Sequence, residues 1–210
     1  MRRATTARGR VGRTVSRVTV QMEPTAPPEG FRRALDSLTS AMAEAIRPGV
    51  TLSDVPAPRK LAPYSIAVAG TVVRGDQDVA SGRFVVLHDP AGQEGWRGHT
   101  RVVAFVSAQV DAEMAADASL GEVGWSWLTE ALQTRGASQV AAGGTVTRTI
   151  SARFGSLADP EEASEIEVRA SWTAVADASG ELDLGQHLLA WCDLLCATAG
   201  LPPPGVTALR

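Results

Sequence analysis

The alternation of apolar and polar residues along the chain predicts three helices and five strands. Apolar residues recur every three or four positions in residues 29–47, 120–132 and 184–199, which is the spacing of an amphipathic helix. Alternating or short apolar runs predict strands at residues 64–73, 83–88, 101–110, 140–154 and 164–175. The order α-β-β-β-α-β-β-α therefore predicts an α+β fold with a five-stranded antiparallel sheet.

The second and third predicted strands are apolar on both faces. In residues 83–88, Phe84 and Val86 alternate with Val85 and Leu87, so both sides of the strand need cover. We expect helix 29–47 or a second subunit to supply the second cover, which favours a homodimer. In the last strand the two faces separate cleanly, and Thr173 is predicted to face water.

The helix at residues 120–132 carries two tryptophans, Trp125 and Trp127. Ser119 and Glu122 have the spacing of a capping box at its start. At about 100° per residue its apolar arc is about 200° wide. A helix on a single sheet needs only a stripe of about 100°, so this helix is predicted to contact a second element as well. Trp125 lies at one edge of the arc and is our candidate for contact with a partner.

Two segments of the chain match at a constant offset. Leu120, Gly121, Trp127 and Gly136 recur 64 residues later as Leu184, Gly185, Trp191 and Gly200. The offset predicts an internal duplication of a hairpin followed by a helix, with chance matching as the alternative.

Charge is distributed unevenly. Residues 1–21 contain six arginines and no acidic residue, so residues 22–210 hold 14 basic and 23 acidic residues, a net charge of −9. This acidic body argues against a dedicated nucleic-acid reader, unless the arginine-rich tail supplies the contacts. We expect residues 1–28 to be a disordered basic and proline-rich extension, with Met22 as an alternative start. Residues 29–205 would then form a single domain and 206–210 a short tail.

The cellular compartment is predicted from what the sequence lacks. No apolar run reaches the roughly 18 residues of a membrane span, and the basic N-terminal segment lacks the apolar run of a secretory signal. Cys192 and Cys196 lie four residues apart on a predicted helix and do not form a typical disulfide framework. A cytoplasmic protein is therefore expected.

The most polar candidate site is the predicted loop at residues 89–99. Its candidate residues are His88, Asp89, Glu94 and His99, which would serve a small metal-dependent hydrolase or another enzyme. Their spacing matches no metal-ligand motif, and no nucleophile elbow or phosphate-binding loop accompanies them. No cofactor or metal site is expected, and the balance is against an enzyme without excluding one.

The leading interpretation is a non-catalytic protein-binding or chaperone-like module. It would act through apolar surface on the first hairpin and on the tryptophan-bearing helix. The candidate partner-binding residues are Trp125, Trp96, Val85 and Leu87. The sequence identifies neither the partner nor the pathway.

Several phrases of the sequence resemble one protein family. They include Pro56-Ala-Pro-Arg-Lys-Leu-Ala-Pro63 and Leu120-Gly-Glu-Val-Gly-Trp-Ser-Trp-Leu128. Over residues 29–205 the chain looks like an actinobacterial family catalogued as domain of unknown function 3000. The resemblance implies a cytoplasmic actinobacterial protein and carries over no catalytic residues. The element order is also similar to that of type III secretion chaperones, small acidic homodimers that bind polypeptides, but this is an analogy of order alone.

Overall fold

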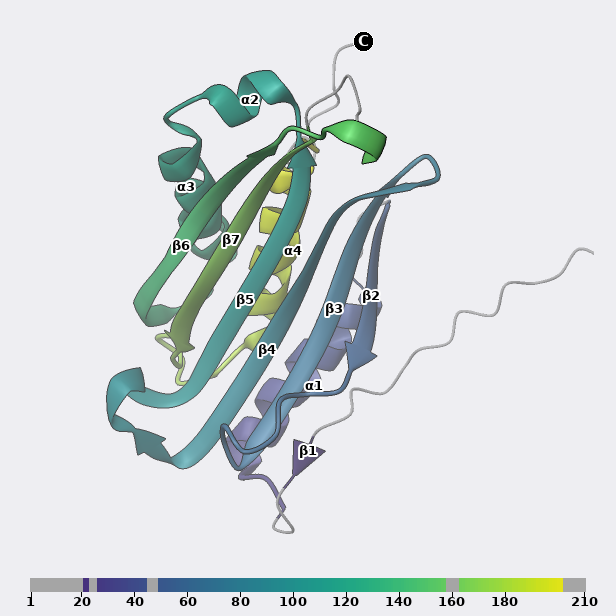
Figure 1. Cartoon of the computed structure of the whole chain (residues 1–210). Helices are drawn as coiled ribbons and strands as arrows, with labels where there is room; N and C mark the ends of the chain where they lie inside the picture. The colour runs from purple at the N-terminus through teal and green to yellow at the C-terminus, as the bar shows by residue number, and fades with distance from the viewer. Residues whose placement is uncertain (1–20, 23–25, 45–48, 158–162, 202–210) are drawn as a thin grey trace, which may run out of the picture.

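The computed structural model describes residues 21–22, 26–44, 49–157 and 163–201. Within these residues the chain forms one antiparallel sheet with helices against one of its faces (Figure 1). The α+β fold is confirmed. The predicted count of five strands is wrong, because the described residues form seven. They are β1 (Gln21–Met22), β2 (Val50–Val55), β3 (Tyr64–Arg74), β4 (Gln77–Gln93), β5 (Gly98–Val110), β6 (Gln139–Ser151) and β7 (Ala163–Ala174).

The two additional strands both lie beside β3. The sheet has the order β1-β3-β4-β5-β7-β6, and β2 pairs with β3 as well. β1 pairs with the start of β3, through Met22 and Tyr64, and β2 pairs with the rest of it, from Ala67 to Val72. Both strands are short, and β2 leads directly into a proline-rich segment. Neither therefore gives the longer alternation from which a strand is predicted.

The helices form the second layer of the fold. They are α1 (Glu29–Glu44), α2 (Ala112–Ala116), α3 (Leu120–Thr134) and α4 (Leu184–Thr198), with short 3-10 turns η1 (Glu94–Trp96) and η2 (Gly155–Leu157). α4 lies between α1 and α3, contacts both, and covers β3, β4 and β5. α3 contacts β6 and α4, which confirms that this helix packs against more than a sheet. None of the described helices combines the length and the apolarity needed to cross a membrane.

The second apolar face of the first hairpin is covered by the chain itself. Val85 and Leu87 are buried in a small cluster with Ala57 and Ala67, and Val55, Ala62 and Trp96 pack against it. The predicted need for cover is confirmed. The predicted source is wrong, because the proline-rich segment after β2 covers this face, whereas α1 packs beside α4 in the other layer.

Two further local predictions are also corrected. Thr173 is completely buried rather than exposed, because the chain at η1 folds over it and its hydroxyl donates to the Trp96 carbonyl. Most of the expected loop 89–99 belongs to β4, η1 and β5. The strands extend because Gln93 and Gly98 still pair across the hairpin.

The capping box predicted for α3 does not form. Ser119 already has helical backbone angles (φ −77°, ψ −12°), so its hydroxyl does not reach the free amides of the first turn. The hydroxyl donates instead to Asp117 Oδ1, at 2.8 Å. The sequence pattern did not reveal that α2 precedes α3 so closely that the chain enters α3 in a helical conformation.

The two hairpins are arranged about a pseudo-twofold axis between β5 and β7. Ala104 pairs with Ala170 and Val106 with Val168, so an offset of 64 residues maps each pair onto the other. α3 and α4 begin 64 residues apart and both contain 15 residues. These features agree with an internal duplication, which itself stays a prediction.

In each half of the fold a tryptophan lies over a glycine of the outer strand. A Cβ atom added to Gly82 would lie 2.9 Å from the ring of Trp191, and one added to Gly144 would lie 2.9 Å from the ring of Trp125. Both added atoms would also meet the carbonyl oxygen of the neighbouring strand, that of Phe105 or Arg169. By this contact Trp125, rather than Trp127, occupies the position that corresponds to Trp191.

We predict that Gly144→Ala destabilises the fold and that Gly143→Ala does not. The new methyl group at Gly144 overlaps the Arg169 carbonyl and the Trp125 ring, whereas nothing lies within 4 Å of a Cβ at Gly143. Overpacking of this kind costs about 1–3 kcal/mol, and a surface substitution changes stability by about 0.5 kcal/mol or less. Urea unfolding of both variants measures the difference. Equal unfolding midpoints would contradict the proposed contact between α3 and β6.

Candidate functional site

Trp125 lines a shallow groove between α3 and β6. Its side chain is partly buried, and the groove is completed by Gly121 and Glu122 of α3 and by Gly144 and Val146 of β6. The absence of a side chain at Gly144 lets the indole ring rest on the strand. One surface of this predicted partner-binding residue therefore supports the helix, and the rest lines a groove at the border of the sheet.

β6 forms that border. Its neighbour in the sheet is β7, and the opposite edge of β6 pairs with no other described strand. The strand is 13 residues long and largely exposed, with no proline and a single charged side chain, that of Arg148. Edge strands are usually protected by prolines, several charges or a cover, because unpaired backbone groups attract other strands. Among the described residues this edge carries little such protection.

The other three predicted partner-binding residues contribute to intramolecular packing. Val85 and Leu87 are 8% and 6% exposed beneath the segment that follows β2, and Trp96 packs against the same small cluster while its carbonyl accepts from Thr173. The structure thus places Trp125 apart from Val85, Leu87 and Trp96, in a different part of the sheet.

A pocket lies at the mouth of the first hairpin, where the predicted loop site was expected. It has a volume of about 450 Å³ and is formed by three parts of the chain: the start of α1, the ends of β4 and β5, and the loop between β7 and α4. Its walls include Phe31, His88, His99 and Thr100. We call it the hairpin-mouth pocket.

His88 is the buried polar group of this pocket. Its ring stacks on Phe31, with centroids 4.1 Å apart and planes 7° apart, and its Nδ1 lies 2.8 Å from the hydroxyl oxygen of Thr100. Nε2 is buried and has no hydrogen-bond partner among the described residues. Burial, with a smaller effect of nearby His99 and against that of Asp89, lowers the pKa of His88 to about 4. The imidazole is therefore neutral at pH 7.

The four predicted loop residues are only partly brought together. His88 and His99 both line the pocket. Asp89 instead holds the turn, since its carboxylate accepts from the Ala91 amide and from Gln93 Nε2. Glu94 is exposed on η1 and does not line the pocket. Across the described part of the chain, no three His, Cys, Asp or Glu side chains gather in a way that would hold a metal ion, which weakens the hydrolase interpretation.

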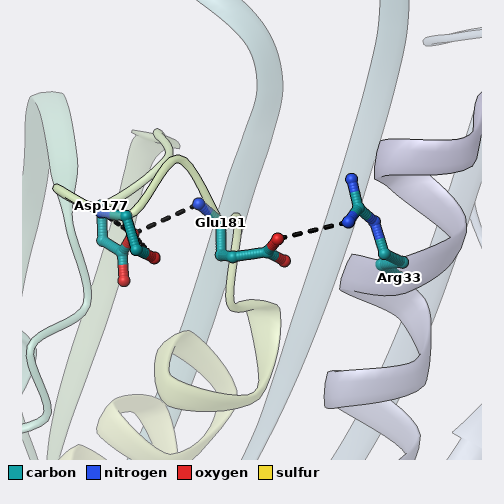
Figure 2. A network of polar contacts seen from close by, with 4 residues as sticks. Arg33, Asp177 and Glu181 are labelled. Atoms are coloured by element: carbon teal, nitrogen blue, oxygen red, sulfur yellow. Dashed lines mark hydrogen bonds and ion pairs between the residues drawn. The ribbon is translucent and has the colours of Figure 1, made fainter.

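An ion pair crosses the rim of the pocket. Arg33 of α1 donates to Glu181 Oε1 at 3.3 Å, and the amide of Glu181 donates to Asp177 Oδ1, which holds the loop in place (Figure 2). Both side chains of the pair are more than half exposed, so water and salt screen it and it contributes little stability. It therefore marks a rim that opens easily rather than a fixed wall.

The third histidine and both cysteines have structural roles. Trp172 Nε1 donates to His187 Nδ1 at 3.0 Å in the core, and burial lowers the pKa of His187 to about 4. Cys192 and Cys196 are buried free thiols, and burial raises the pKa of Cys192. A protonated, buried thiol is a poor nucleophile and metal ligand.

The sequence analysis missed the residues that complete the pocket. Thr100 follows His99 directly and pairs with His88 across the hairpin, so placing the turn correctly would have found it. Phe31 and Leu182 come from parts of the chain far from this hairpin, and no local signal connects them to His88.

We predict that acid weakens the fold partly through His88. The folded-state pKa lies below the ordinary value of 6.5, so the unfolded chain binds protons more readily and stability falls as the pH decreases from 6.5 towards 4. This histidine should account for roughly 2 kcal/mol of the loss by pH 4.5. His88→Phe, which cannot be protonated, should therefore lose correspondingly less stability in urea unfolding at pH 7.5 and 4.5. An identical loss in the variant and the wild type would contradict this role.

Comparisons with known proteins give one match. Neither curated proteins nor solved structures match the chain significantly. The likeness in element order to type III secretion chaperones therefore stays a prediction. Among protein families, residues 27–207 match the one described as protein of unknown function (DUF3000). Because this match covers the helices and the sheet from α1 onwards, the chain belongs to the DUF3000 family.

Proposed function

We propose that the protein is a non-catalytic protein-binding module that adds a strand of its partner to the edge of β6. The observation that carries this proposal is the long, weakly protected edge of β6 beside the Trp125 groove. The partner would be an extended polypeptide segment with an apolar or aromatic side chain. This retains Trp125 as a contact residue and leaves Val85, Leu87 and Trp96 to the interior.

Strand addition accounts for both parts of the surface. The free amides and carbonyls of an edge strand supply main-chain hydrogen bonds, which bind many sequences in the same way. A neighbouring pocket then selects among side chains, because alternate residues of an added strand point to the same face of the sheet. The Trp125 groove lies on the helix side of β6, next to Val146, where such a side chain would enter.

The chemistry of the described residues supports binding rather than catalysis. The most buried candidate base, His88, is a weak base because its pKa is about 4. Buried free thiols at Cys192 and Cys196 are compatible with the reducing cytoplasm that we propose as the compartment.

We predict that lysines on β6 weaken partner binding. Peptides selected from a random display library on the full chain should contain an apolar or aromatic anchor. Thr145→Lys with Thr147→Lys should reduce their affinity at least about tenfold, since inserted lysines protect an edge strand. Ser81→Lys on β4, also exposed, is the matched control and should bind as the wild type does. Isothermal titration calorimetry measures all three proteins.

Three results would count against this proposal. One is equal affinity of the selected peptides for the β6 double variant and the wild type. Another is a library that yields no peptide. In the third, light scattering finds a stable dimer that the two lysines dissociate, which would assign the edge to a second copy of the chain, the homodimer expected from the sequence.

A further inference from the structure

We propose that the hairpin-mouth pocket binds a compact, neutral and mainly apolar ring-shaped molecule that carries one hydroxyl group. This site is separate from the β6 edge, since the pocket and the Trp125 groove share no lining residue. The inference therefore does not depend on the strand-addition function. It rests on the size of the pocket, on its walls and on the one unpartnered buried polar atom there.

The size and the walls of the pocket fit a small organic ligand. Its volume of about 450 Å³ lies in the range of about 300–1,000 Å³ that is common for ligand sites. Most of the wall is apolar or glycine, from Phe31, Pro90, Ala174, Val175 and Leu182 with Gly30 and Gly98. A flat ring is expected to fit beside Phe31 because aromatic rings pack favourably by offset stacking or by edge-to-face contact.

His88 supplies the polar recognition. The ring is 92% buried (8% exposed), and its orientation is fixed by Phe31 on one face and by Thr100 at Nδ1. A buried polar atom without a partner is costly, so Nε2 favours an occupant that completes its hydrogen bonding. A hydroxyl group suits either tautomer of the ring, because it donates to a bare Nε2 and accepts from a protonated one.

Charge selects for a neutral ligand. His88 stays uncharged at pH 7, so it offers no cation to a carboxylate or a phosphate. The cation at the rim, Arg33, is paired with Glu181, so the pair presents both signs of charge to an entering molecule. A charged ligand would lose its hydration without gaining a buried counter-ion.

The test uses three matched probes of the same ring system: 2-naphthol, naphthalene and 2-naphthoate. Binding to the full chain is followed by amide chemical shifts around the pocket, such as those of Phe31, Thr100 and Ala176. We expect 2-naphthol to bind roughly threefold to tenfold more tightly than naphthalene, the worth of one hydrogen bond, and the anion to bind most weakly.

Two variants separate the hydrogen bond from the space. His88→Phe keeps an aromatic ring beside Phe31 and removes Nε2, so the preference for 2-naphthol over naphthalene should disappear. Gly30→Leu should remove binding of both probes, because this glycine lines the pocket and a Cβ there meets nothing within 4 Å, so the fold should tolerate the side chain. Thr147→Val on exposed β6 is the control and should bind as the wild type does.

The proposal is overturned by any of three results. The first is a wild type that binds 2-naphthol and naphthalene equally, or that shows no shifts around the pocket. The second is an unchanged preference in His88→Phe. The third is undiminished binding in a folded Gly30→Leu variant. Loss of peptide binding at β6 would leave all three readings unaffected, so failure of one proposal is distinguishable from failure of the other.

Discussion

The pairing of β5 with β7 is the constraint on which the rest of the structure depends. It joins two hairpins that are separate in the sequence into one sheet, through 11 paired positions from Thr100 with Ala174 to Val110 with Ser164. At its centre the inward side chains are small, with Ala104 opposite Ala170. Small side chains there leave the helix layer free to approach the sheet closely. The pairing also leaves β6 at the border, since β7 has β5 on one side and β6 on the other.

The same register creates the hairpin-mouth pocket. Because Thr100 pairs with both His88 and Ala174, the open end of the first hairpin lies beside the loop that leads from β7 into α4. α1 then places Phe31 on His88 and closes the third side. A slip of one residue would turn every side chain of β7 to the opposite face, so Trp172 would leave the core and the pocket would lose its wall together with the fold.

The helix layer is attached to the sheet at two corresponding points. Trp191 of α4 rests on Gly82, and Trp125 of α3 rests on Gly144, each beside the carbonyl of the next strand. In both places a large ring fills the space that a missing side chain leaves, which secures a close approach between layers. The two tryptophans differ in environment. α4 lies between α1 and α3, so Trp191 is fully buried, whereas α3 lies at the border and Trp125 stays partly exposed.

Most elements of the fold could be predicted from the sequence, because their signals are local. Helix α3 was expected at 120–132 and found at 120–134, and the strand expected at 164–175 was found at 163–174. Signals from long-range contacts were lost. The cover of Val85 comes from a proline-rich segment whose own pattern indicates only an extended connector, and the burial of Thr173 comes from the chain at η1. Both residues lie where the side-chain alternation is sound and a distant segment decides what covers them.

The candidate site shows the same division more sharply. His88 and His99 were found because histidine beside a turn is a local signal, but their partners Phe31 and Thr100 were not. Burial then changes what the histidine does: a side chain that reads as a general base in the sequence becomes a neutral group with one unpartnered nitrogen. Residue type alone therefore favoured catalysis, whereas the environment favours recognition. The wall opposite His88 is held to α1 by an exposed ion pair of little strength. Packing within the pocket, including that of an occupant, is thus the larger force that keeps the start of α1 in place.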